Sequence, residues 1–169
     1  PAWEGTVSVP RGATELDRVS DVVTVPAVQG SQMCAVAFQG RAACFDMQGG
    51  SQIWSKEVSS VAGITMDDRR VFIPDEQGVV HAFDRGTGAS VWRQDKLKYR
   101  NLSAPVALPM GLVVGDAEGF LHVLDRDTGE FISRMNVGGG GVMSILPALS
   151  PNTVLLQTRG GSLMAVTLQ

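Results

Sequence analysis

The chain has 169 residues, of which 44% are hydrophobic and 18% charged, so it is long enough for one globular domain and too apolar for bulk disorder. It carries 14 Lys and Arg residues against 17 Asp and Glu residues, a net charge of −3. A duplex-binding protein normally has a basic surplus, so we expect no nucleic-acid partner. No apolar run approaches the roughly 18 residues that a membrane-spanning helix needs.

A repeated unit runs along the chain. Its clearest copy is AFDRGTGASVW at residues 82–92, and related copies begin at Cys44, Val123 and Ala165. The third position of each copy falls at residues 46, 84, 125 and 167, so the period is 38 to 42 residues. A period near 40 residues, with regular turn signals and no helical periodicity, is typical of propeller blades.

We therefore predict an all-β fold: a β-propeller fragment of about four blades, each of four antiparallel strands. Residues 1–9 are expected to form the outer strand of a preceding blade, and residues 10–23 a long inter-blade loop. Three blades are expected over residues 24–58, 61–95 and 102–137, followed by an incomplete last blade of three strands over residues 143–169. Trp54 and Trp92 occupy equivalent positions and are expected to wedge between adjacent blades.

The loop over residues 10–23 breaks the repeat pattern. It is about ten residues longer than the other connections, and it carries five charges without strand alternation. Long loops on rigid β scaffolds often carry function, although a solvated surface loop has the same composition.

The sequence contains few patterns that indicate chemistry. Residues 125–130, DRDTGE, lack the glycine and glutamate positions of a calcium loop, and Gly138–Gly141 does not complete a dinucleotide-binding pattern. His81 and His122 occupy equivalent slots in neighbouring units, and we interpret them as exposed strand histidines. We expect no catalytic residue, no cofactor and no metal site.

The two cysteines lie on neighbouring predicted strands. A two-residue turn at Gln39-Gly40 would pair Ala35 with Cys44 and point Cys34 to the opposite face, which disfavours a disulfide. A three-residue turn would instead place Cys34 opposite Cys44. We treat both as small buried residues.

The repeat A-x-D-x-x-T-G-x-x-x-W resembles the PQQ-type propeller repeat, which quinone-dependent dehydrogenases share with non-enzymatic propellers. A more specific resemblance lies in residues 12–22, GATELDRVSDV, which are similar to the G-x-T-E-[IL]-[DE]-R-L-S-D-V signature of the BamB family. Residues 115–122, GDAEGFLH, resemble that family's GDSEGYLH, and residues 103–106, SAPV, resemble its TSPV. The resemblance runs from Trp3 to the end and corresponds to the C-terminal half of the family's chain.

The resemblance implies an eight-bladed propeller lipoprotein at the periplasmic side of the Gram-negative outer membrane, with an acylated N-terminal Cys that is absent here. It implies a non-enzymatic scaffold subunit of the β-barrel assembly (BAM) complex. This subunit binds the POTRA domains of BamA and assists the folding and insertion of unfolded outer-membrane protein clients. Carried over by the R-L-S-D-V-D motif, the residues implied in BamA binding are Leu16, Arg18, Val19, Ser20 and Asp21. Val23 stands at the second acidic slot.

Other functions stay open on the sequence alone. The chain could be a PQQ-dependent dehydrogenase-type propeller or a general peptide-binding propeller. Residues 2–9 also suggest a homodimer of half-propellers, in which this segment of one copy supplies the missing outer strand of the last blade of the other. Alternatively, the segment closes its own chain into a four-bladed ring.

Overall fold

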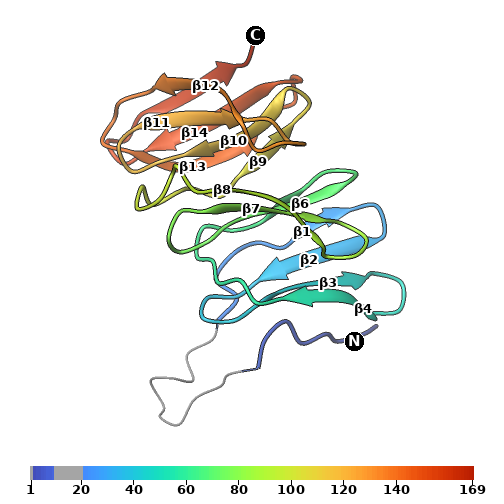
Figure 1. Cartoon of the computed structure of the whole chain (residues 1–169). Coiled ribbons are helices and arrows are strands. Elements are labelled where there is room, and N and C mark those ends of the chain that lie inside the picture. The colour runs from blue at the N-terminus through green and yellow to red at the C-terminus, as the bar shows by residue number, and fades with distance from the viewer. Residues whose placement is uncertain (1, 10–20) are drawn as a thin grey trace, which may run out of the picture.

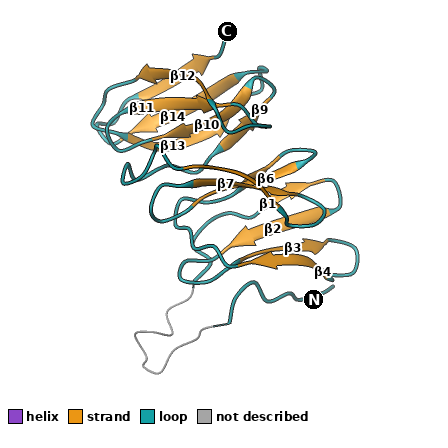
Figure 2. Ribbon diagram, in the orientation of Figure 1, coloured by secondary structure: helices purple, strands orange, loops and turns teal. Residues whose placement is uncertain are grey.

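Strands and turns, without a helix, make up residues 2–9 and 21–169, which the computed structural model describes (Figure 2). Four antiparallel sheets follow one another in chain order from the N-terminal to the C-terminal end (Figure 1). Each sheet is a meander in which consecutive strands pair, as expected for propeller blades. The predicted all-β propeller fragment is therefore confirmed.

The strands are short and regularly spaced. The first sheet contains β1 (Ala27–Gln29), β2 (Gln32–Val36), β3 (Ala42–Asp46) and β4 (Gln52–Lys56). The second contains β5 (Thr65–Met66), β6 (Arg70–Pro74), β7 (Val80–Asp84) and β8 (Ser90–Gln94). The third contains β9 (Val106–Leu108), β10 (Gly111–Gly115), β11 (Phe120–Leu124) and β12 (Phe131–Asn136). The last has three strands, β13 (Val142–Pro147), β14 (Thr153–Thr158) and β15 (Leu163–Thr167).

The core lies between the sheets, because the central strands are apolar on both faces. On β6, Val71 and Ile73 pack with the first sheet, whereas Phe72 between them packs with the third. On β10, Leu112 faces the second sheet and Val113 faces the last one. Strand alternation thus sends successive side chains into different inter-sheet layers, which holds the stack together.

Tryptophans connect neighbouring sheets, as predicted. The indole nitrogen of Trp54 donates a hydrogen bond to the carbonyl oxygen of Arg85 at 2.8 Å, and Trp92 does the same to Arg126 at 2.9 Å. Trp3 repeats the contact with the carbonyl oxygen of Met47 at 2.8 Å. Each ring therefore docks on the turn that follows the third strand of the next sheet.

The repeated aspartate builds that turn. The Asp84 carboxylate accepts hydrogen bonds from the hydroxyl and backbone N–H of Thr87, and Asp125 does so from Thr128. Hydrogen bonds from Thr87 hold the pKa of Asp84 below its ordinary value. The repeat motif thus encodes the turn on which the tryptophan docks.

A disulfide joins Cys34 and Cys44, so the expectation that a disulfide is disfavoured was wrong, whereas the predicted burial of both residues is confirmed. The backbone N–H of Ala37 donates to the carbonyl oxygen of Arg41, which leaves three residues in the β2–β3 turn. This turn length puts Cys34 directly opposite Cys44 in the register, and both are fully buried.

The N-terminal segment docks on the first sheet. Residues 2–9 pair with none of the four sheets, and their place as the outer strand of a preceding blade stays a prediction. Trp3 and Gly5 contact the first sheet, at the opposite end of the stack from the last sheet, so closure of one chain into a four-bladed ring was wrong (Figure 1). Strand donation between two copies stays a prediction. Residues 10–20, most of the long loop, lie outside the described residues.

Candidate functional site

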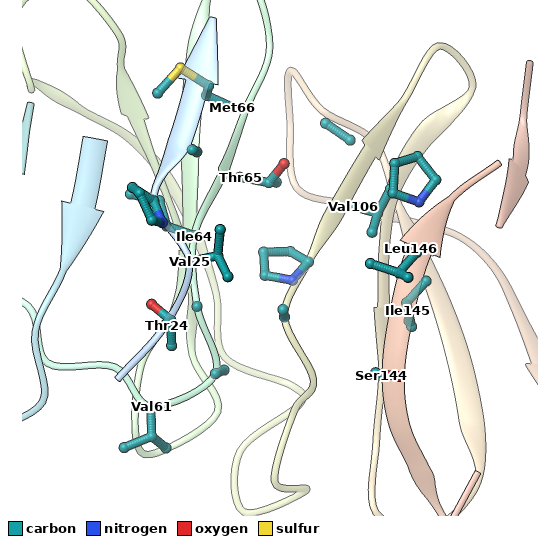
Figure 3. Close-up of a pocket in the computed structure, with 18 of the residues that line it drawn as sticks. Thr24, Val25, Val61, Ile64, Thr65, Met66, Val106, Ser144, Ile145 and Leu146 are labelled. Atoms are coloured by element: carbon teal, nitrogen blue, oxygen red, sulfur yellow. The ribbon is translucent and has the colours of Figure 1, made fainter. Parts of the chain in front are cut away.

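A groove runs along the inner strands of all four sheets. It has a volume of about 820 Å³ and is bordered by β1, β5, β9 and β13 together with the residues just before them. Figure 3 shows labelled side chains of these segments across the groove, from Val25 and Ile64 to Val106 and Leu146. The inner strands of successive sheets lie next to one another, so they form a continuous wall.

The groove wall is almost entirely apolar. Among the described residues that line it, the side chains with a polar group are Thr24, Thr65 and Ser144, and none is charged. This part of the wall is suited to apolar contact.

Asp21 marks the point where the signature loop joins the propeller. Its carbonyl oxygen accepts the backbone N–H of Phe38 at 2.8 Å, which ties it to the β2–β3 turn. Its side chain is exposed. The following segment is rich in exposed valines that lead onto the groove wall: Val22, Val23, Val25 and Val28.

Of the residues implied in partner binding, only Asp21 belongs to the part of the chain that the structure describes. Leu16, Arg18, Val19 and Ser20 lie outside it. The structure therefore shows where the loop ends, namely beside the groove and at the β2–β3 end of the first sheet.

A buried charged cluster was not foreseen from the sequence. Asp116 is fully buried, and its Oδ2 lies 2.8 Å from both Arg100 Nη1 and His122 Nε2. Its Oδ1 accepts the backbone N–H groups of Glu118 and Phe120 at 3.0 and 2.9 Å. The carboxylate therefore closes the β10–β11 turn and also anchors an arginine that follows the preceding sheet.

The environment fixes the charges in this cluster. Burial acts to raise the pKa of Asp116, but hydrogen bonds from His122, Phe120 and Arg100 outweigh burial and lower it below its ordinary value. Burial lowers the pKa of His122, against the opposing effect of Asp116. At neutral pH, Asp116 is thus a carboxylate and His122 a neutral ring that donates from Nε2.

The same arrangement recurs in the second sheet, which gives its sequence signal. Asp75 Oδ2 lies 2.8 Å from His81 Nε2, and Asp75 Oδ1 accepts two backbone N–H groups of its turn. Both copies have Asp, Gly and His at the spacing D-x-x-G-x-x-H. The interpretation of both histidines as exposed was wrong, because His122 is 1% exposed and His81 is half-buried against its aspartate.

Within residues 2–9 and 21–169, no group of three His, Cys, Asp or Glu side chains is placed to hold a metal ion. The same residues contain no helix of the length and apolarity that a membrane crossing requires. The repeated tryptophan contacts, the Asp-Thr-Gly turns and the apolar inner wall define a propeller built from PQQ-type repeats.

Comparison with known proteins places the chain within a family of such propellers. The family model described as "Outer membrane protein assembly factor BamB" matches residues 1–94 and 76–169. This chain belongs to the BamB family. The BamB of Bordetella pertussis is 48% identical over 165 residues, and that of Burkholderia pseudomallei is 41% identical over 161 residues. These matches cover 97% and 95% of this chain but 42% of each relative, so the chain spans less than half of their length.

Solved structures agree with this assignment. The crystal structure of BamB from Moraxella catarrhalis matches 94% of this chain and 47% of its own, with a TM-score of 0.87 at 31% identity. The quinohemoprotein alcohol dehydrogenase from Comamonas testosteroni matches with a TM-score of 0.69 at 19% identity, which shows a shared fold alone.

Proposed function

We propose that this chain forms part of a non-enzymatic scaffold subunit of the outer-membrane β-barrel assembly complex. In this role it binds the POTRA domains of BamA and assists the folding and insertion of outer-membrane proteins. The observation that carries the proposal is membership of the BamB family, whose relatives are named outer membrane protein assembly factors. The whole subunit includes sequence beyond this chain, which covers 42% of those relatives.

The BamA-binding residues under this proposal are Leu16, Arg18, Val19, Ser20 and Asp21. Asp21 supports the assignment because its side chain is exposed while its carbonyl is fixed to the first sheet. Charged side chains on a firmly attached segment orient a partner and speed encounter more than they add affinity.

Two features support a role without catalysis. None of the described residues that line the groove is charged. The buried carboxylate Asp116 already has its oxygen atoms occupied by a turn, a histidine and an arginine. Its contacts are those of a structural cluster, so neither site offers a free acid or base to a substrate.

The disulfide supports a location at the periplasmic side of the outer membrane. Cys34 and Cys44 are joined in the core of the first sheet. Such bonds persist in oxidising compartments, of which the bacterial periplasm is one. A lipid anchor at the N-terminus of the whole subunit would hold it at the membrane.

A charge reversal tests the proposed contact. We expect Asp21→Arg to weaken binding to the soluble POTRA domains of BamA by about fivefold or more, the upper range for an exposed ion pair. Glu130→Arg is the matched control, because Glu130 is also exposed but belongs to the β11–β12 turn of the third sheet. If both variants bind the POTRA domains with the affinity of the unmodified chain, Asp21 is not part of the interface.

A further inference from the structure

A second pocket lies between the second and third sheets, away from the groove. It has a volume of about 370 Å³ and is formed by the segment after β8 and by β11 and β12. Three of its eight lining residues are cations, and none is an acid: Lys96, Leu97, Arg100, His122, Phe131, Ile132, Ser133 and Arg134. The lining side chains therefore carry a positive charge, which the Asp116 and Glu118 carboxylates bound to Arg100 offset in part.

Two of the three cations are available to a ligand. Arg100 is held by Asp116 and Glu118, both at 2.8 Å. Arg134 and Lys96 are exposed and form no ion pair with any residue of the described chain. The guanidinium of Arg134 lies 4.7 Å from the centre of the Phe120 ring on β11, a cation–π contact.

The remaining lining selects for an apolar group beside the anion. Leu97 is buried at the base, while Phe131 and Ile132 are 38% and 54% exposed. Large apolar side chains exposed beside unpaired cations suit a ligand that carries both kinds of group. A bare inorganic anion would leave these side chains in water.

Besides its cations and its apolar side chains, the pocket has a third feature, the free edge of β12. This strand is the outermost in its sheet, and all six of its residues are exposed. Its backbone N–H and C=O groups on the outer side are open to pairing, the arrangement used when an extended peptide adds to a sheet. The edge runs past Ile132 and Arg134 and therefore along the rim of the pocket.

We propose that this pocket binds the C-terminal carboxylate of an extended peptide whose last residue is apolar. A peptide C terminus presents a carboxylate, an apolar side chain and backbone amides within a few ångströms of one another. The carboxylate meets Arg134 and Lys96, the last side chain packs on Phe131 and Ile132, and the preceding backbone pairs with β12. Arginine suits this task because its planar fork matches carboxylate geometry.

The neighbouring sheet provides a matched control. Arg93 on β8 is paired with His81, as Arg134 on β12 is paired with His122. Arg93 is exposed as well, but it does not line this pocket. A change at Arg93 thus removes the same charge from the same register position of a different blade.

The test uses fluorescence anisotropy with the chain and a labelled heptapeptide of alternating valine and threonine that ends in leucine. We expect the free-carboxylate peptide to bind at least about fivefold more tightly than the same peptide with a C-terminal amide. Arg134→Gln and Lys96→Gln should each weaken binding about three- to fivefold, and Arg93→Gln less than about twofold. POTRA-domain binding should be unchanged in all three, which separates this site from the proposed loop interface.

Three results would overturn the proposal. The first is equal binding of the carboxylate and amide peptides, or no saturable binding of either. The second is an equal loss with Arg93→Gln and Arg134→Gln, which would indicate general charge attraction. The third is complete competition by inorganic phosphate at the peptide's own concentration, which would indicate a simple anion site.

Discussion

Trp54 donates its indole N–H to the backbone carbonyl oxygen of Arg85, 2.8 Å away in the next sheet. The same indole ring packs on Gly88 of the next sheet. A side chain at Gly88 would have no room there. Trp92 repeats both contacts with Arg126 and Gly129. One hydrogen bond and one glycine thus define how the first sheet meets the second and the second meets the third.

Replacement of Gly88 by alanine should disrupt this junction. The residue has a φ of +71°, and an added Cβ would lie 2.7 Å from the Trp54 ring. We expect Gly88→Ala to lower the free energy of unfolding by about 3 kcal/mol, combining backbone strain with overpacking. Urea unfolding, monitored by tryptophan fluorescence, measures this decrease in the free energy of unfolding.

Gly30→Ala is the matched control for that prediction. Gly30 has a similar φ of +60°, but nothing lies within 4 Å of an added Cβ. It should therefore cost only the backbone strain, about 1 kcal/mol. Equal losses for the two variants would show that the contact with Trp54 is unimportant.

Removal of the charge from Asp116 should destabilise the third sheet. Its fully buried carboxylate holds Arg100 and His122, both at 2.8 Å. We expect Asp116→Asn to lower the free energy of unfolding by about 3 kcal/mol, since Arg100 loses the buried one of its two carboxylate partners. Asp75→Asn alters an equivalent turn that has a histidine but no arginine partner, and its loss should be smaller. Chemical denaturation measures the free energy of unfolding of both variants. A larger decrease for Asp75→Asn than for Asp116→Asn would refute the prediction.

His122 should make stability depend on mildly acidic pH. Burial lowers its pKa in the folded chain below the ordinary value of 6.5. The unfolded chain therefore binds the proton more readily, so the free energy of unfolding should fall as the pH drops below about 6.5. His122→Gln keeps an N–H donor for Asp116 and should flatten this dependence. Identical pH profiles of His122→Gln and the unmodified chain, from urea unfolding between pH 5 and pH 7, would contradict the argument.

The disulfide should contribute measurably to stability. Cys34 and Cys44 are ten positions apart, and a closed loop of that size restricts the unfolded chain by about 3 kcal/mol. Dithiothreitol should therefore lower the melting temperature of the unmodified chain. The double variant Cys34→Ala, Cys44→Ala should melt at the lower temperature and show no response to reductant. If dithiothreitol also lowers the melting temperature of the double variant, the disulfide is not the cause of the response and the prediction fails.

The repeat made the architecture predictable, because each of its residues has a local task. Asp84 and Thr87 form a turn, and Trp54 and Trp92 fill the space between sheets. The turn depends on residues three positions apart, and the tryptophan recurs at a fixed place in successive repeats, so a sequence displays both.

Features that depend on longer-range partners were not predictable in the same way. The disulfide required the three-residue turn between Ala37 and Arg41, where sequence allowed two turn lengths. The ionic cluster at Asp116 required Arg100, which comes from the end of the preceding sheet. Residues 2–9 were expected to form a strand, but no neighbouring strand pairs with them in the described chain.

The most direct test of the central claim is a calorimetric titration of this chain with the soluble POTRA domains of BamA. We predict saturable binding with one site per chain, weakened by Asp21→Arg and unaffected by Glu130→Arg. Absence of binding, or binding that both charge reversals alter equally, would contradict a scaffold role that acts through the segment ending at Asp21.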